Sequence, residues 1–486
     1  MTGEAGLWQT TLSKEVNRGA YFLPARKGLR GKTSVPGDKS ISHRAVILGA
    51  VCSGTVKISG FLQSADTLAT VAAIRALGVE VDDRDGTLWI HGRGWEGLAE
   101  PQDVIDVVNA GTLIRLLPGV VAALPITCVF TGDASIRRRP MARILQPLAT
   151  MGAQVLGRQN NTLAPFVIRG GELRGMTHEL PVASAQVKSC LLLAGLRALG
   201  ETAVIEPGLS RDHTERLICY AGGRVEREDL IGPGLASGTG VVRVWPADCL
   251  QMTELSVPGD FSSAAFFLVA GALVPNSNIT LLNVGLNPTR IGFLAKLQEM
   301  GADISVETMS SSGPEPLGRL SVRTSELVAA DVGPSEVPNL IDELPLFLLA
   351  AAKARGISRL RGAAELRAKE SDRLAAMAAV LRALGIKVTE YPDGIDVEGQ
   401  PDGWEGGRIA SCGDHRIAMV GGVAGLASRQ GVFVDDFACA AVSYPDFAAT
   451  VANLGGQVRF VAEPGAPGDQ VEQSEELRGE LRGGRG

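Results

Sequence analysis

Charged and small polar residues stand directly before apolar, helix-like runs at several places in this 486-residue chain. In the first of them, Gly37-Asp38-Lys39-Ser40 opens such a run, and Arg44 lies one helical turn beyond Ser40. The free N–H groups at the start of a helix, together with a lysine and an arginine, form a favourable site for a small anion. An ordinary capped helix with solvated charges explains the same residues equally well.

The first half of the chain contains further segments of this kind. Gly111 lies among small residues before an apolar run, where backbone N–H groups can approach a phosphate. Arg139 belongs to a cluster of four arginines, and a guanidinium binds phosphate or carboxylate through two hydrogen bonds. Taken alone, such segments are more often capped core helices or solvated loops. The side chains that could form a second anion cradle are Ser184, Gln186, Ser210 and Arg211.

The second half adds carboxylates and a histidine. Asp342 and Glu343 precede a wholly apolar run, where a carboxylate is either a general base or a helix N-cap. Glu370 and Arg373 are three residues apart, which also suits an ion pair on the surface of a helix. The remaining candidates in this half are Lys369, Asp414, His415 and Arg416.

Helix starts that faced one cleft would concentrate positive potential there. The predicted ligand is a small molecule with several negative charges, or a pair of such molecules. The whole chain carries 47 basic and 53 acidic residues, which argues against a nucleic-acid partner. The sequence has no spacing typical of metal ligands and no G-x-x-x-x-G-K-[ST] loop, so neither a metal site nor a P-loop is expected.

A six-fold repeat indicates the elements that position these residues. An apolar helix end, a glycine and an alternating strand recur at intervals of 70–84 residues. Glycine ends a helix in the left-handed conformation at little cost, and the alternation suits a half-buried strand. The pattern therefore predicts α/β units of about 75 residues. The glycines are Gly78, Gly152, Gly222, Gly301, Gly385 and Gly455.

The repeat divides into two halves of three units, because VPGDKS at Val35 returns as VPGDFS at Val257. We expect an α/β fold of two similar domains with a cleft between them and chain crossings at the two Pro-Gly dipeptides. Periodicity alone does not assign the N-terminal residues to either domain. The expected boundaries are 37–257 for the first domain, 1–36 with 258–463 for the second, and 464–486 for a disordered tail with a short helix at Val471–Leu481.

In order and spacing these motifs resemble those of the 5-enolpyruvylshikimate-3-phosphate synthase (3-phosphoshikimate 1-carboxyvinyltransferase) family. The resemblance extends from about Gly37 to Phe447 and rests on GDKSISHR, NAGT with Arg115, RRRPM, SAQVK, SRDHTE, IDELP, KESDR, GDHRIAM and SYPDF. It implies two inverse α/β domains of three βαβαββ units each, which close on substrate. The implied reaction transfers the enolpyruvyl group of phosphoenolpyruvate to the 5-hydroxyl of shikimate 3-phosphate. It passes through a tetrahedral intermediate, releases phosphate, uses no metal or organic cofactor, and leads to chorismate and the aromatic amino acids.

The resemblance also implies roles for individual residues. Asp342 would take the proton of the 5-hydroxyl. Glu370 and Lys39 would move the proton at the methylene carbon, with His415 nearby. The residues that would bind shikimate 3-phosphate are Lys39, Ser40, Arg44, Ser184, Ala185, Gln186, Ser210, Arg211, Asp342 and Lys369. Those that would bind phosphoenolpyruvate are Lys39, Gly111, Arg139, Gln186, Arg373 and Arg416.

Two positions depart from the family's pattern. Val442 stands where some members carry a lysine that contacts phosphate, and Glu365 stands where other members have asparagine. The motifs GDKS, SAQVK, RDHTE and NPTR (Asn287–Arg290) occur together, as in the class II members that tolerate the herbicide glyphosate. Gly111 is kept, however, where alanine is one route to tolerance, so the response to glyphosate is not predicted.

Three alternatives compete with this hypothesis. The sister enolpyruvyl transferase that acts on UDP-N-acetylglucosamine usually carries a cysteine in the loop that here reads GDASIRRRPMA, and this loop has none. A non-catalytic anion sensor on the same scaffold would have lost acid/base residues such as Asp342 and Glu370. An RNA-end-processing enzyme would need a basic surface, against which the net charge of −6 argues.

The expected setting is a cytoplasmic monomer with no membrane partner. The seven cysteines are scattered and form no C-x-x-C pair, which suits a reducing compartment. No apolar run reaches the length of about 20 residues that crosses a bilayer.

Overall fold

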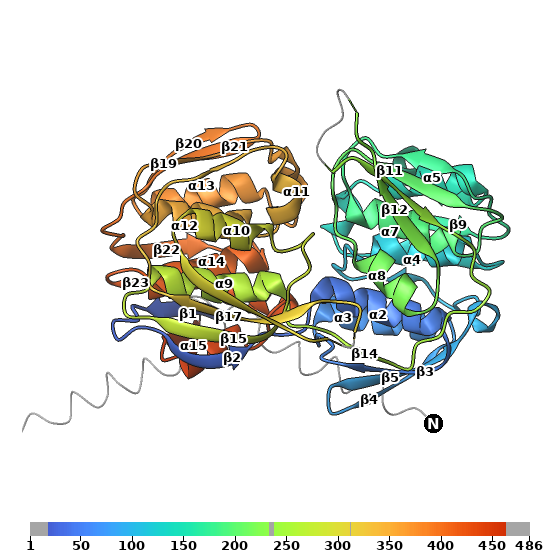
Figure 1. Cartoon of the computed structure of the whole chain (residues 1–486), viewed down its shortest axis with the longest axis horizontal. Coiled ribbons are helices and arrows are strands. Elements are labelled where there is room, and N and C mark those ends of the chain that lie inside the picture. The colour runs from blue at the N-terminus through green and yellow to red at the C-terminus, as the bar shows by residue number, and fades with distance from the viewer. Residues whose placement is uncertain (1–17, 233–237, 312, 463–486) are drawn as a thin grey trace, which may run out of the picture.

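The computed structural model describes residues 18–232, 238–311 and 313–462. The predicted tail at 464–486 and the short helix expected within it lie outside these residues. Figure 1 shows two lobes side by side, with the first half of the chain in one and most of the second half in the other. Each lobe has its own hydrophobic core, formed by residues between 41 and 257 in the first and by residues 20–35 with 261–454 in the second.

In the described part of the chain, six four-stranded sheets share one topology, in which an edge strand runs parallel to its neighbour and the other two pairings are antiparallel. The six-fold repeat predicted from the sequence is therefore present in the structure. The labels follow Figure 1. In the first lobe the sheets are β14 (Glu254–Ser256)-β3 (Ser53–Ser59)-β5 (Thr87–Arg93)-β4 (Glu80–Arg84), β6 (Ile105–Asp106)-β7 (Thr127–Thr131)-β9 (Leu163–Arg169)-β8 (Gln154–Gly157), and β10 (Thr177–Glu179)-β11 (Thr202–Glu206)-β13 (Gly240–Val244)-β12 (Val225–Asp229). In the second lobe they are β2 (Arg30–Ser34)-β15 (Asn278–Gly285)-β17 (Leu317–Arg323)-β16 (Asp303–Met309), β18 (Asp331–Val332)-β19 (Ile357–Leu360)-β21 (Gly394–Glu398)-β20 (Lys387–Tyr391), and β22 (Gly406–Ala410)-β23 (Gly431–Asp435)-β1 (Arg18–Leu23)-β24 (Gln457–Ala462).

Each sheet is accompanied by one deeply buried helix and one more exposed helix. The buried helices are α2 (Lys39–Val51), α4 (Leu113–Ala122), α7 (Ala185–Gly195), α9 (Phe261–Leu273), α12 (Leu344–Lys353) and α14 (His415–Leu426). The others are α3 (Ala65–Ala76), α5 (Ala142–Met151), α8 (His213–Tyr220), α10 (Gly292–Glu299), α13 (Arg373–Ala383) and α15 (Phe447–Asn453). The short helical segments are α6 (Arg158–Asn161), α11 (Val337–Leu340), η1 (Trp95–Gly97), η2 (Ile136–Arg138), η3 (Ala364–Ala368) and η4 (Phe437–Val442).

The glycines of the repeat end the more exposed helices as predicted. All six have positive φ, between 80° and 125°. The edge strand of each unit begins two or three residues after the glycine, from β4 after Gly78 to β24 after Gly455. Only a residue without a Cβ adopts this conformation at little cost, so the repeated glycine fixes the turn from helix to strand.

The chain crosses between the lobes at the two Pro-Gly dipeptides. β2 pairs with β15 of the second lobe and leads into α2 of the first, while β14 pairs with β3 of the first lobe and leads into α9 of the second. At the crossing the N–H of Asp38 donates to Pro258 O and the N–H of Asp260 donates to Pro36 O, both over 2.8 Å. Both β1 and β2 belong to sheets of the second lobe, an assignment that periodicity alone did not make. The exact boundaries at residues 37 and 257 stay a prediction.

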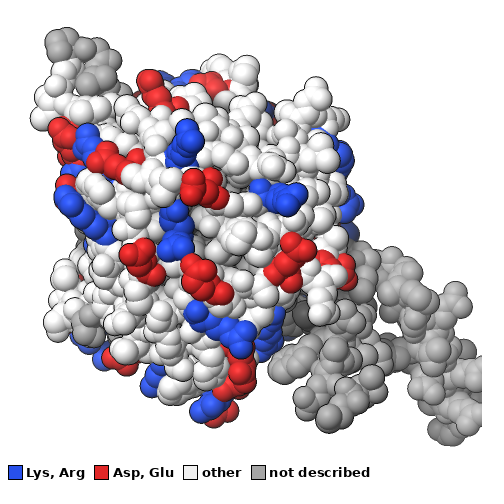
Figure 2. Space-filling model, turned by 90° about the vertical axis from the view of Figure 1, so that its right-hand side faces the viewer, with Lys and Arg blue, Asp and Glu red and all other residues white. Residues whose placement is uncertain are grey.

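None of the described helices combines the length and the apolar character that crossing a bilayer requires. On the outer face of the first lobe, basic and acidic side chains alternate without a patch of one sign (Figure 2). The concentration of charge lies instead in the cleft between the lobes.

Candidate active site

The cleft between the lobes has a volume of about 1030 Å³. It is lined by residues at the starts of all six buried helices, among them Lys39, Thr112, Ala185, Asp260 and His415. Every residue to which the resemblance gave a catalytic or binding role lines this cleft except Arg373. Helix N-termini attract anions through their free N–H groups and the helix dipole. The structure thus brings the predicted residues together in one site of suitable charge.

Lys39 and Arg44 stand on α2 in the wall of the first lobe. Asp38 caps the helix, accepting from the N–H of Ile41 over 2.8 Å. Lys39 forms an ion pair of 3.1 Å with Asp66 of α3, which holds the ammonium group near the N-terminus of α2. The guanidinium of Arg44 donates to Thr214 over 2.7 Å and lies beside Ser40.

Gly111 is packed against two arginines at the start of α4. A Cβ added there would lie 2.6 Å from Nη1 of Arg139 and 3.3 Å from Nη1 of Arg115. Arg115 donates to the amide oxygen of Gln186 over 2.8 Å and so orients that side chain. Burial lowers the pKa of Arg115 to about 9, with Arg143 and Arg139 adding to the effect. The glycine therefore leaves room for several guanidinium groups beside one helix start.

A buried charged cluster lies behind the second predicted cradle, where Ser184 and Ala185 begin α7. The hydroxyl of Ser210 donates to Glu206. Glu206 is fully buried and pairs with Lys188 over 2.9 Å. This carboxylate orients the serine at the cleft surface, a contact that the spacing of the motifs does not reveal.

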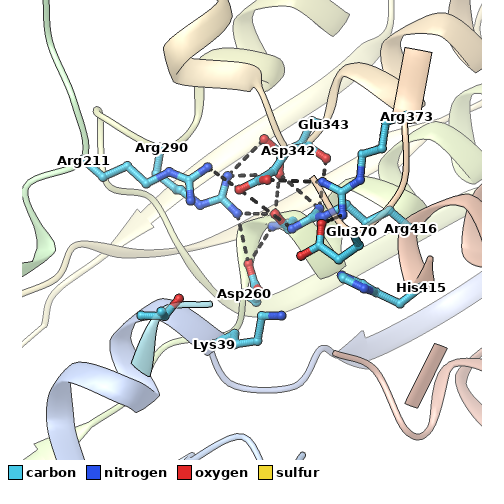
Figure 3. A network of polar contacts seen from close by, with 12 residues as sticks. Lys39, Arg211, Asp260, Arg290, Asp342, Glu343, Glu370, Arg373, His415 and Arg416 are labelled. Atoms are coloured by element: carbon cyan, nitrogen blue, oxygen red, sulfur yellow. Dashed lines mark hydrogen bonds and ion pairs between the residues drawn. The ribbon is translucent and has the colours of Figure 1, made fainter. Parts of the chain in front are cut away.

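Asp342 is surrounded by guanidinium groups where α12 begins (Figure 3). Its carboxylate lies 2.6 Å from Arg211 of the first lobe, and 3.7 and 3.9 Å from Arg373 and Arg416. Burial would raise the pKa of Asp342, but Arg416, Arg211 and Lys369 outweigh it and hold the pKa well below its usual range. The side chain is therefore an ionised hydrogen-bond acceptor, the form that a general base needs.

Glu370 is the second carboxylate of the cleft. It pairs with Arg373 over 2.6 Å and with Arg139 of the first lobe over 3.5 Å. Burial would raise its pKa, but Arg373 and Arg139 hold the pKa of Glu370 well below its usual range. Lys369 and Glu370 precede α13, which begins at Arg373, so Lys369 does not share a helix face with Arg373.

Arg373 lies behind the cleft wall. Its side chain is only 1% exposed, and its Nε donates to Asp414 over 2.8 Å. It forms ion pairs with three carboxylates, those of Asp342, Glu370 and Asp414. A direct contact between Arg373 and a substrate stays a prediction.

His415 begins α14 and faces the cleft. Burial, followed by the positive charge of Lys39, lowers its pKa to about 3. Burial also lowers the pKa of Lys369, against the opposing effect of Asp342. His415 is therefore neutral near pH 7. In any proton transfer its imidazole starts from the neutral form and not from the imidazolium form.

Glu365, one of the two positions that depart from the family's pattern, also lies at the cleft. It forms an ion pair of 3.3 Å with Arg143 of the first lobe. Val442 ends η4 and is not among the residues that line the cleft. Glu365 thus contributes a contact between the lobes.

Several supporting residues were given no catalytic or binding role by the resemblance. Asp66 holds Lys39, Glu206 holds Ser210, and Asp414 holds Arg373. Asp414 stands in a motif that sequence analysis singled out, so its position gave a signal. Asp66 and Glu206 had none, because each meets its partner only through packing of separate elements. Within the described residues, no group of three or more His, Cys, Asp or Glu side chains is arranged to hold a metal ion.

The arrangement pairs an ionised carboxylate acceptor with several cations that face one cleft. Such a site can bind two anionic molecules, remove a proton from a hydroxyl and stabilise negative charge that develops in the reaction. Comparison with known proteins identifies the family. The family model of EPSP synthase (3-phosphoshikimate 1-carboxyvinyltransferase) matches residues 24–451. The chain belongs to this family.

Similar proteins agree along most of the length. The chain is 47% identical over 419 residues to the 3-phosphoshikimate 1-carboxyvinyltransferase of Desulfitobacterium hafniense, which covers 86% of this chain and 94% of that protein. The 3-phosphoshikimate 1-carboxyvinyltransferase of Desulforudis audaxviator is 49% identical over 434 residues, which cover 89% of this chain and 98% of that protein. The structure of EPSP synthase from Acinetobacter baumannii superimposes with a TM-score of 0.81 at 40% identity, covering 91% of this chain and all of that one.

These matches confirm the resemblance predicted from the motifs, the α/β fold class and the assignment as an enzyme. The enzyme belongs among the enolpyruvyl transferases of the shikimate pathway. The sister transferase, the anion sensor and the RNA-end-processing enzyme are accordingly set aside.

Proposed function

We propose that the cleft transfers the enolpyruvyl group of phosphoenolpyruvate to the 5-hydroxyl of shikimate 3-phosphate and releases phosphate. The observation that carries this assignment is the ionised Asp342 among guanidinium groups, at the meeting of six helix starts. A base for one hydroxyl and cationic subsites for two anionic substrates are what this addition–elimination requires.

Asp342 accepts the proton of the 5-hydroxyl as the hydroxyl oxygen attacks the enol carbon of phosphoenolpyruvate. Lys39 and Glu370 lie on opposite walls of the cleft and move the proton at the methylene carbon. His415 stays neutral beside them. In the addition step the methylene carbon gains a proton and becomes a methyl group. When the tetrahedral intermediate collapses, a proton leaves this methyl carbon, the carbon–carbon double bond forms again, and the carbon–oxygen bond to phosphate breaks.

The binding residues divide between the two substrates. Ser40, Arg44 and Lys369 hold the carboxylate and hydroxyls of shikimate 3-phosphate, while Ser184, Ala185, Ser210 and Arg211 hold its phosphate. Gln186 lies against the ring and, with Lys39, Gly111 and Arg139, meets the phosphate of phosphoenolpyruvate. Arg416 and Arg373 bind the carboxylate of phosphoenolpyruvate.

Release of phosphate by the purified protein tests the reaction. Phosphoenolpyruvate and shikimate 3-phosphate are supplied without added metal, and UDP-N-acetylglucosamine serves as the parallel acceptor. Turnover with shikimate 3-phosphate alone is the expected result. Turnover with UDP-N-acetylglucosamine, or with neither acceptor, would contradict the proposal.

We further propose that the enzyme acts as a monomer in the cytoplasm. Both walls of the cleft come from one chain, so a single copy supplies all the proposed residues. Its seven cysteines are free thiols, which suits a reducing compartment. Light scattering of the purified protein measures the mass in solution and tests the first point.

A further inference from the structure

A second arginine–glutamate pair adjoins Asp342, and of its two residues Arg290 lines the cleft and Glu343 does not. Glu343 follows Asp342 in the chain and is completely buried. Nη1 of Arg290 lies 3.0 Å from each carboxylate oxygen of Glu343 (Figure 3). The mechanism above gives no role to either residue.

The environment leaves Glu343 dependent on this arginine. An ionised carboxylate without contact to water is costly unless a cation and hydrogen bonds compensate it. Arg290 supplies the cation, and its Nη1 donates to both carboxylate oxygens of Glu343. The hydroxyl of Ser262 donates a further hydrogen bond to the same carboxylate. The side chain of Arg290 is itself only 4% exposed.

Arg416 is the next cation within reach of Glu343. Its Nη1 lies 3.8 Å from Oε1 of Glu343, beyond hydrogen-bond distance, and donates to the backbone oxygen of Asp342 over 3.0 Å. Arg416 lines the cleft space in which it is proposed to bind the substrate carboxylate. A small rotation of its guanidinium toward Glu343 would turn it away from that space.

Arg290 is held in place from the opposite lobe. It ends the segment Asn287–Arg290, in which Asn287 donates to Asp212 over 2.7 Å and Thr289 donates to the same carboxylate over 3.2 Å. Asp212 belongs to the first lobe, between the cleft residue Arg211 and the start of α8. The loop therefore fixes where the guanidinium of Arg290 can lie.

We propose that Arg290 is a positioning residue for phosphoenolpyruvate: by satisfying Glu343, it leaves Arg416 free to bind the substrate carboxylate. The proposal rests on the role proposed for Arg416 above. It assigns a function to the NPTR motif that is separate from direct contact with a substrate.

The variant Arg290→Met removes the charge while keeping most of the side chain's volume. Glu343 then draws Arg416 away from the cleft. We expect the KM for phosphoenolpyruvate to rise about tenfold or more, while kcat and the KM for shikimate 3-phosphate change less than about threefold. The double variant Arg290→Met/Glu343→Gln removes the charge of Glu343, the carboxylate 3.8 Å from Arg416, and keeps Asp260, which also pairs with Arg290 over 3.4 Å. It should return the KM for phosphoenolpyruvate to within about threefold of the wild-type value.

Lys296→Met is the matched control. Lys296 is also buried in the second lobe and pairs with Glu299 and Glu336, but it does not line the cleft. Its loss should lower thermal stability without changing the KM for phosphoenolpyruvate.

Three outcomes would overturn the proposal. They are an unchanged KM for phosphoenolpyruvate in a folded Arg290→Met, an equal rise in the Lys296→Met control, and a double variant as impaired as the single one. The last would mean that Arg290 itself binds substrate. If the single variant does not fold, the double variant still decides, because a raised KM in it contradicts the proposal. Failure of the wild-type enzyme to release phosphate would instead reject the proposed function.

Discussion

The carboxylate of Asp342 combines two properties that a single residue rarely has. It is buried, yet its pKa is held well below the usual range because Arg416, Arg211 and Lys369 outweigh the effect of burial. The carboxylate is therefore ionised and can accept a proton, although its proton affinity is low. Arg211 comes from the opposite lobe, so a phosphate that drew Arg211 away would raise the proton affinity of Asp342.

Replacing Asp342 by asparagine should affect turnover far more than binding. Because the amide cannot take up the hydroxyl proton, we expect kcat to fall by about 10²–10⁴. The dissociation constant of shikimate 3-phosphate, measured by calorimetry, should change only a few-fold. Comparable losses of turnover and binding would show that Asp342 only positions the substrate.

Gly111→Ala should weaken the binding of phosphoenolpyruvate without harming the fold. The added Cβ would lie 2.6 Å from Nη1 of Arg139, which is the far end of a flexible side chain and can move. We expect the KM for phosphoenolpyruvate to rise roughly three- to tenfold, with the melting temperature within about 2 °C of wild type. Steady-state kinetics with either substrate varied measures this, and an unchanged KM would place Arg139 outside the phosphate site.

At the scale of elements, the site depends on close packing of the buried helices. Gly119 of α4 faces α7, and a Cβ on it would overlap the backbone carbonyl of Cys190. α4 begins beside Gly111 and α7 begins at Ala185, so the distance between these helices sets the spacing of two binding segments.

Gly119→Ala should destabilise the first lobe, because backbone rather than a flexible side chain must move. Overpacking of this kind costs about 1–3 kcal/mol in free energy of unfolding. Urea denaturation measures the loss, and Gly111→Ala is the matched control at the start of the same helix. Equal stability of the two variants would argue against rigid α4–α7 packing.

The start of α14 should make stability depend on pH. Burial, followed by Lys39, lowers the pKa of His415 to about 3, against 6.5 for a free histidine. Between these values the unfolded chain binds the proton and the folded chain does not, so this histidine increasingly favours unfolding as the pH falls below 6.5. His415→Asn should therefore gain stability relative to wild type on acidification, by up to about 1.4 kcal/mol per pH unit. Urea denaturation at pH 7.5, 6 and 5 tests the trend, and a difference that does not change with pH would contradict it.

At the scale of the whole molecule, ion pairs cross the cleft between the lobes. Arg211–Asp342, Arg139–Glu370 and Arg143–Glu365 span 2.6, 3.5 and 3.3 Å. The first two pairs consist of residues proposed to act on the substrates. Binding of anions must therefore rearrange the contacts that hold the lobes together.

We expect shikimate 3-phosphate to draw the lobes closer. The radius of gyration, about 23 Å for a compact chain of this length, should fall by roughly 1 Å at saturation. Small-angle scattering measures the change, and shikimate without its phosphate is the control ligand, which should cause a smaller change. A radius unaffected by shikimate 3-phosphate would reject closure.

The sequence by itself determined the repeating elements and the family. The glycine at each helix end and the alternation after it are local patterns, since a helix end and the next strand are neighbours in the chain. The motifs likewise placed the candidate residues at helix starts, so the sequence determined most of the cleft's chemistry.

Only the tertiary structure decided which residues meet. Lys39 and Asp66 are 27 positions apart, Arg290 and Glu343 are 53 apart, and Arg211 and Asp342 are 131 apart. No local period links such pairs, because their distance depends on how separate helices pack and how two lobes face each other. For the same reason the resemblance could imply a substrate-binding role for Arg373 but not its partner Asp414, which only the packing of α13 against α14 brings to it; the substrate contact itself stays a prediction.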